Sequence, residues 1–130
     1  MEALVLRSVQ TEIMTTSQRG KRGEAIAAAA LTEAGYEILD RNWRCATGEL
    51  DLVARHHDEI VFVEVRSRTD GTGAALESIT PRKAAKLTAL AYEYLAEHEM
   101  EDAAFRIDIA AVSFAAGKAS VEIVENAVGW

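Results

Sequence analysis

The sequence of 130 residues has one cysteine, one proline and no long apolar run. The single cysteine, Cys45, excludes an intrachain disulfide framework and a zinc site built from cysteines. The longest apolar run, residues 25–31, is far too short to cross a bilayer. The N-terminal sequence MEALVLRSVQTE lacks the basic start and the long apolar segment of a signal peptide. We therefore expect a cytoplasmic protein that does not act in a membrane.

Positive charge is scarce as well. Fourteen Lys and Arg residues stand against 21 Asp and Glu, for a formal net charge of −7. This balance argues against indiscriminate binding to nucleic acids or anionic membranes. The deficit is uneven, because residues 41–86 carry eight basic and seven acidic side chains, whereas residues 87–130 carry two and eight. The middle of the chain is the part best suited to face an anion, the more so if a cation neutralises some of its carboxylates.

Apolar residues make up 49% of the chain, which is enough to build the core of one domain. Strong helix formers fill residues 19–34, and Gly35 follows where a helix C-terminal glycine belongs. Thr80 and Pro81 are typical of a second helix start, and the helical spacing of apolar residues continues to about residue 98. β-branched and aromatic residues with a period of two predict five strands, over residues 36–44, 49–55, 59–67, 105–114 and 120–124.

The resulting order, α-β-β-β-α-β-β, predicts an α/β domain with a central mixed β-sheet flanked by α-helices. The helix between the third and fourth strands implies that some neighbouring strands run parallel. We expect residues 1–17 to form an irregular N-terminal arm and residues 18–130 to form a single domain. Segment 68–78 is expected to be a flexible loop, and its part with the two glycines, residues 69–73, a mobile flap over a substrate groove.

The period of two sorts the middle strands into faces. In the second strand, one face is predicted to hold Glu49, Asp51 and Val53, and the other Leu50, Leu52 and Ala54. In the third strand, Glu64 and Arg66 follow apolar residues on one face. If the two strands form an antiparallel hairpin, Asp51 and Glu64 come close together. A hard divalent cation, Mg²⁺ or Mn²⁺, would relieve the repulsion between their carboxylates.

Other side chains can join this pair. Glu24 lies among alanines that allow close contact between the first helix and the sheet, and Lys21 and Arg22 precede it by about one turn. Basic residues on both sides of the predicted flap are placed to contact backbone phosphates. Arg68 precedes the flap, and Arg82, Lys83 and Lys86 follow it. Spacing alone leaves an alternative open, in which Asp51–Arg66 and Glu64–Arg41 are ordinary cross-strand ion pairs and Glu24 is solvated.

Four short segments carry a resemblance to a known family; they are Gly23-Glu24, residues 35–44 (GYEILDRNWR), residues 48–53 (GELDLV) and residues 61–68 (VFVEVRSR). In this order they resemble the bacterial YraN-like family, over roughly residues 18–113. That family is similar to archaeal Holliday-junction resolvases and to the restriction-endonuclease-like PD-(D/E)xK superfamily. The resemblance implies a restriction-endonuclease-like fold and a Mg²⁺- or Mn²⁺-dependent nuclease that acts on structured or branched DNA. Relatives that cut junctions work as dimers, which makes a homodimer an expectation here.

The resemblance also implies roles for particular residues. Asp51 and Glu64 match the metal-binding acids, the main-chain carbonyl of Val65 completes the ligand set, and Glu24 matches a helix glutamate that assists the site. Arg66 departs from the pattern, because the superfamily usually has lysine there. A guanidinium can stabilise charge on a phosphate but is a poor base. Two alternatives therefore stay open: a nucleic-acid-binding relative with impaired catalysis, and a protein-interaction module that uses the acidic last third of the chain.

Overall fold

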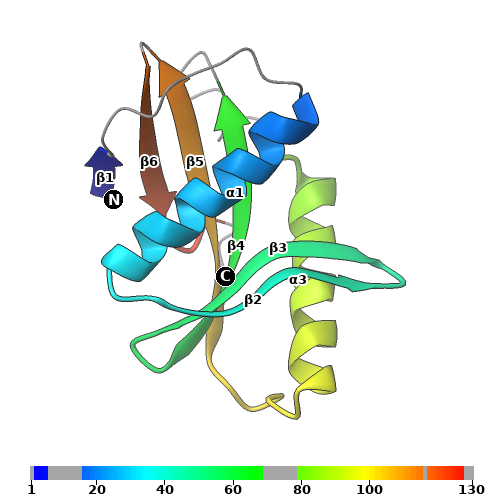
Figure 1. The fold of residues 1–130 in the computed structure, drawn as a ribbon. Coiled ribbons are helices and arrows are strands. Elements are labelled where there is room, and N and C mark those ends of the chain that lie inside the picture. The colour runs from blue at the N-terminus through cyan, green and yellow to red at the C-terminus, as the bar shows by residue number, and fades with distance from the viewer. Residues whose placement is uncertain (1, 6–15, 69–78, 116, 128–130) are drawn as a thin grey trace.

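The computed structural model of the chain describes residues 2–5, 16–68, 79–115 and 117–127. Within these ranges, six strands form one sheet in the order β1-β6-β5-β4-β3-β2, and two helices cover its faces (Figure 1). The helices are α1 (Thr16–Glu33) and α3 (Pro81–Glu97). The strands are β1 (Glu2–Val5), β2 (Glu37–Cys45), β3 (Gly48–His56), β4 (Glu59–Arg68), β5 (Phe105–Ala115) and β6 (Lys118–Val124). The predicted α/β sandwich of a mixed sheet and flanking helices is confirmed.

Strand β4 forms the centre of the core, because it is buried on both sides. Val61 and Val63 pack in a cluster with the α1 residues, whereas Ile60 and Phe62 pack in a second cluster with the α3 residues. Val65 continues the first set and is partly buried against the α1 cluster. The alternation predicted for this strand is confirmed, and it determines which helix each later side chain faces.

The pairing of the strands is mixed, as the helical crossover predicted. Strands β2, β3 and β4 pair antiparallel, and α3 then carries the chain to β5, which lies parallel to β4. The β3–β4 ladder pairs Leu52 with Val63 as its last residues toward the β2–β3 turn. Asp51 and Glu64 come next on the two strands, so the carboxylates lie just beyond the end of this ladder.

The predicted helix boundaries have clear local causes. Gly35 takes a φ of +96°, and the Tyr36 N–H donates to the Leu31 carbonyl at 2.9 Å, so α1 ends in the glycine-dependent manner that the sequence predicted. At the start of α3, the Thr80 hydroxyl oxygen accepts a hydrogen bond from the Lys83 N–H at 3.1 Å. Pro81 occupies the first turn, where its missing N–H costs nothing.

Two expectations need correction. Residues 2–5, placed in an irregular arm, form strand β1 and pair antiparallel with β6; four residues are too few to reveal a period, and the edge of β6 supplies their backbone partners. Leu50 does not share a face with Leu52, because Leu50 packs in the α3 cluster and Leu52 in the α1 cluster. The regular alternation of β3 is broken at Asp51. Residues 69–78, which contain the predicted flap, lie outside the described residues.

Candidate functional site

The site lies where Gly23 of α1 packs against Ser67 of β4. A Cβ atom placed on Gly23 would overlap the side-chain oxygen of Ser67, so only glycine allows this contact between helix and strand. The neighbouring residue, Glu24, is thereby brought over the end of the β3–β4 hairpin. Gly23 therefore has a steric role, because its small size allows the close packing that positions Glu24.

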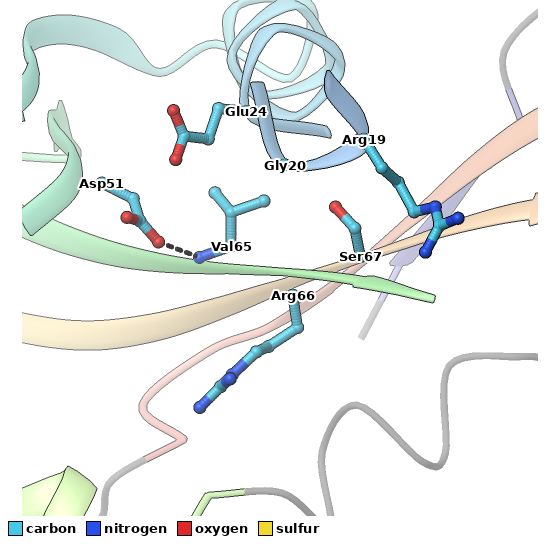
Figure 2. A pocket seen from close by; sticks show the side chains of 7 residues that line it. All are labelled: Arg19, Gly20, Glu24, Asp51, Val65, Arg66 and Ser67. Carbon is cyan, nitrogen blue, oxygen red and sulfur yellow. Dashed lines mark hydrogen bonds between the residues drawn. The ribbon is translucent and has the colours of Figure 1, made fainter. Parts of the chain in front are cut away.

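A pocket of about 270 Å³ opens at this contact. It is lined by Arg19, Gly20, Glu24, Asp51, Val65, Arg66 and Ser67. Figure 2 shows that Val65 and Ser67 project from β4 toward α1, whereas Arg66 projects to the opposite side of the strand. The pocket therefore brings carboxylates and guanidinium groups together around one strand. Arg19 was not among the residues that the sequence singled out.

Asp51 is tied to β4 by its side chain. Its Oδ2 accepts a hydrogen bond from the Val65 N–H at 2.9 Å, drawn as a dashed line in Figure 2. Burial, and next the charge of Glu64, raise the pKa of Asp51 from 3.8 to about 7. A hydrogen bond between the two carboxyl groups contributes to the same shift, so Asp51 and Glu64 are direct neighbours, as the hairpin predicted.

Glu64 lies on the α3 side of β4 and is only 6% exposed. Its Oε2 lies 3.1 Å from Lys83 Nζ and 3.5 Å from Arg66 Nη2. The prediction that Glu64 and Arg66 share a face is confirmed. Lys83 reaches Glu64 from the first turn of α3, a contact that strand spacing alone does not reveal.

A second group of acids lies on the α1 side. Oxygens of Glu24, Glu49 and Asp51 all lie within 4.8 Å of one another. Burial, and next the charge of Glu49, raise the pKa of Glu24. The sequence placed Glu49 on the face of Asp51 but gave it no role; its position two residues before Asp51 was the signal available.

The chemistry of this donor set fits a hard divalent cation. Carboxylate oxygens are the ligands that Mg²⁺ and Mn²⁺ prefer, and partly buried acids held close together gain most when a cation neutralises them. Asp51 and Glu24, which lie beside other acids, both have raised pKa values. Glu24, Glu49 and Asp51 could hold such an ion, and Glu64 adjoins Asp51 outside this group.

The predicted phosphate-binding residues are spread over three elements, α1, β4 and α3. Lys21 on α1 is exposed, as are Arg82 and Lys86 on α3. Arg22 is partly buried, and its Nε has no hydrogen-bond partner among the described residues. Lys83 is engaged with Glu64. The side chain of Arg68 lies outside the described set. The structure thus brings Lys83 into the site and leaves Lys21, Arg82 and Lys86 at the surface.

A family model described as "Uncharacterised protein family UPF0102" matches residues 23–112. The chain belongs to the UPF0102 family. The UPF0102 protein of Roseiflexus castenholzii is 48% identical over 113 residues, covering 84% of this chain and 91% of that protein. The UPF0102 protein of Chloroflexus aurantiacus is 50% identical over 108 residues, covering 81% of this chain and 88% of that protein. The resemblance to the YraN-like family is confirmed, and the matched span contains every acid of the site.

Two solved structures share part of the fold of this UPF0102 chain. One, titled "Structure of EndoMS-dsDNA2 complex", aligns with 75% of this chain and 36% of that chain, at a TM-score of 0.39 and 21% identity. The other, "The structure of Pyrococcus Furiosus SfsA in complex with Ca2+", aligns with 87% of this chain and 64% of that chain, at a TM-score of 0.44 and 20% identity. At scores this low, neither likeness bears on the function of this chain. No helix in the described ranges is long and apolar enough to span a membrane.

Proposed function

We propose that this UPF0102 protein is a nuclease of the PD-(D/E)xK type that hydrolyses phosphodiester bonds of structured or branched DNA with Mg²⁺ or Mn²⁺. The observation that carries the proposal is the convergence of Asp51, Glu64 and Glu24 at the end of one hairpin, beside a pocket that also holds Arg19 and Arg66. Carboxylates bind the cation that this chemistry needs, and guanidinium groups suit a phosphate.

Each acid has a place in the proposed cation site. Asp51 and Glu64 are the side-chain ligands, the carbonyl of Val65 is the main-chain ligand, and Glu24 assists from α1. A cation bound there would lower the pKa of a water molecule and stabilise negative charge on the phosphate oxygens. The Val65 N–H holds the Asp51 carboxylate in position. Neutralisation of Asp51 and Glu64 by the ion would remove the repulsion that now raises the pKa of Asp51.

The basic side chains would serve the phosphate. Arg66 lines the pocket and pairs with the same Glu64 oxygen as Lys83; in this proposal its guanidinium would turn to a scissile phosphate when DNA is bound. Lys21 and Arg22 on α1, with Arg82 and Lys86 on α3, would contact the DNA backbone on either side, as would Arg68. We propose further that the protein acts in the cytoplasm, and that two copies act together on a branched substrate.

One feature favours a second candidate, a DNA-binding relative with little cleavage. Arg66 occupies the position where the resemblance implies lysine, and a guanidinium is a poor proton acceptor. Its pairing with Glu64 suits binding of an anion as well as it suits catalysis. Binding without cleavage is therefore the alternative against which the nuclease must be tested.

The deciding experiment is a cleavage assay on labelled duplex, single-stranded, flapped and four-way-junction DNA, with Mg²⁺ or Mn²⁺ and with EDTA. We expect metal-dependent cleavage of at least one branched substrate by the parent and none by Asp51→Asn or Glu64→Gln. Asp58→Asn is the matched control, because Asp58 is an exposed aspartate in the β3–β4 turn, away from the pocket. Binding without cleavage in all proteins would favour the second candidate. If the proteins neither bind nor cleave DNA, the protein-interaction module is the remaining candidate.

A further inference from the structure

Asn42 occupies an unusual position on the edge strand β2. Its neighbours Arg41 and Trp43 pair with Leu52 and Leu50 of β3, so Asn42 lies level with Asp51. The backbone of Asn42 has a φ of +52°, in the left-handed region that asparagine tolerates better than most residues. This distortion lies beside the point where the alternation of β3 breaks.

The side chain of Asn42 joins two acids of the site. With the amide nitrogen facing them, it donates to Glu49 Oε1 at 2.8 Å and to Glu24 Oε1 at 2.9 Å. The opposite orientation would point the amide oxygen at carboxylate oxygens, so the hydrogen-bond network decides the orientation. One amide group therefore links α1 to β3 through their carboxylates.

Such a link has a physical task here. Oxygens of Glu24, Glu49 and Asp51 lie within 4.8 Å of one another, and like charges at this range repel. Asp51 is held by the Val65 N–H, whereas the two glutamate side chains are longer and more easily turned toward solvent, and the Arg44 Nε that lies 3.3 Å from Glu49 Oε2 belongs to an exposed side chain. Hydrogen bonds from a neutral donor to charged acceptors are strong enough to keep both in place, without adding a charge that would compete with a cation.

We propose that Asn42 is a positioning residue of the site, which holds the Glu24 and Glu49 carboxylates beside Asp51 in the arrangement that receives a divalent cation. This inference rests on the proposed function in that it requires a cation at these acids. It adds a residue that strand spacing could not assign, because the role depends on the left-handed backbone. Loss of a group that orients metal ligands typically lowers metal affinity about 10- to 100-fold.

The test compares two asparagines that share a backbone conformation. Asn42→Gly removes the amide and leaves a residue that accepts a positive φ without strain. Asn126→Gly is the matched control, because Asn126 has a φ of +50° and is exposed in the turn after β6. Mn²⁺ is titrated into the parent and both variants by calorimetry, thermal unfolding checks that each is folded, and metal-free crystal structures of parent and Asn42→Gly locate the carboxylates.

We expect Asn42→Gly to bind Mn²⁺ about 10- to 100-fold more weakly than the parent, while Asn126→Gly binds as the parent does. Equal affinity in the parent and Asn42→Gly would overturn the inference. If the parent binds no Mn²⁺, the cation site of the proposed function is refuted. The metal-free structures then show whether Asn42 positions the two glutamates. In that case the positioning role is refuted if Glu24 and Glu49 keep their places in Asn42→Gly, and survives as a purely structural one if they separate.

Discussion

The carboxylate of Asp51 accepts a hydrogen bond from the backbone N–H of Val65, 2.9 Å away on the neighbouring strand. The bond lies just beyond the last paired residues of the β3–β4 ladder, Leu52 and Val63. It therefore replaces the backbone pairing that stops there, and it fixes the acid relative to the peptide unit next to Glu64. The carboxylates meet because a side chain continues the connection between the two strands.

Stability should depend on the ionisation of Asp51. Burial and the adjacent Glu64 raise its pKa from 3.8 to about 7. Because the folded protein holds this proton more tightly than the unfolded chain, the stabilising contribution is fully present below the unfolded pKa and is lost as pH rises through the folded pKa. We expect the melting temperature in EDTA to fall between about pH 5 and about pH 8, and to fall less in Asp51→Asn.

The effect of Asp51 is measured as the difference in melting temperature between the parent and Asp51→Asn at each pH, because the other acids titrate in both proteins. Saturating Mn²⁺ should raise the melting temperature of the parent at the alkaline end more than at the acid end, because the cation binds the ionised carboxylates. A parallel pH dependence in parent and Asp51→Asn would show that Asp51 is ionised like an ordinary surface acid.

Substitution of Gly23 should separate α1 from the sheet. An added Cβ would overlap Ser67 Oγ and lie 3.3 Å from Ser67 Cβ. We expect Gly23→Ala to lower the free energy of unfolding by about 1–3 kcal/mol, as overpacking does, and to weaken Mn²⁺ binding by displacing Glu24. Urea unfolding and calorimetry measure the two effects.

Gly20 offers the matched control one turn earlier on α1. A Cβ there would meet nothing within 4 Å, so Gly20→Ala should instead stabilise the helix, by up to about 1 kcal/mol. Adding Ser67→Ala to Gly23→Ala removes the overlapping oxygen and should restore most of the lost stability. If Gly23→Ala and Gly20→Ala change the free energy of unfolding equally, the contact with Ser67 is not the reason for glycine at position 23.

A buried ion pair on β5, where Asp108 lies level with Val63 of β4, should stabilise the fold without contributing a group to the site. Asp108 is fully buried and accepts hydrogen bonds from Arg106 Nε at 3.0 Å and from the Asn126 N–H at 2.9 Å. Asp108→Ala leaves the Arg106 guanidinium, itself largely buried, without this partner. We expect a loss of about 3–5 kcal/mol in urea unfolding, as for other broken buried pairs, with unchanged Mn²⁺ affinity in the folded protein.

The parts that the sequence predicted correctly are those fixed by local pattern. The alternation in residues 60–65 identified a strand buried on both sides, and the short turn before it brought Asp51 beside Glu64. The Thr80 cap and Gly35 gave the helix ends. Each of these depends on a few neighbouring residues, so the sequence carries the information directly.

The remaining contacts depend on how distant elements pack. Asn42, which has a left-handed backbone, bridges two acids on different elements, and Leu50 and Leu52 of the neighbouring strand pack on different faces. Lys83 meets Glu64 only because α3 returns along that side of β4. No period of two or 3.6 contains this information, so a basic residue expected to contact DNA proved to pair with a site acid.

Arg66 separates the nuclease from the binding relative. Its Nη2 lies 3.5 Å from Glu64 Oε2, beside the Lys83 ammonium at 3.1 Å from the same oxygen. If the guanidinium stabilises charge on a scissile phosphate, its removal should cost on the order of 10²–10³ in cleavage rate, as for other electrostatic contacts of this kind. We expect that loss in Arg66→Ala, measured with saturating Mg²⁺ or Mn²⁺ on the branched substrate that the parent cuts best.

Arg66→Lys tests whether the arginine limits the rate. Lysine is the residue that the resemblance implies at this position; it keeps the positive charge, and it can also exchange a proton, which arginine does poorly. We therefore expect Arg66→Lys to cleave faster than the parent, while Arg55→Lys, at an exposed strand position that pairs with Glu37, leaves the rate unchanged. The nuclease proposal is wrong if the parent and Arg66→Lys are both folded and bind branched DNA but cut none of the substrates. Arginine in place of lysine would then not explain the lack of cleavage, and the binding relative would be the better description.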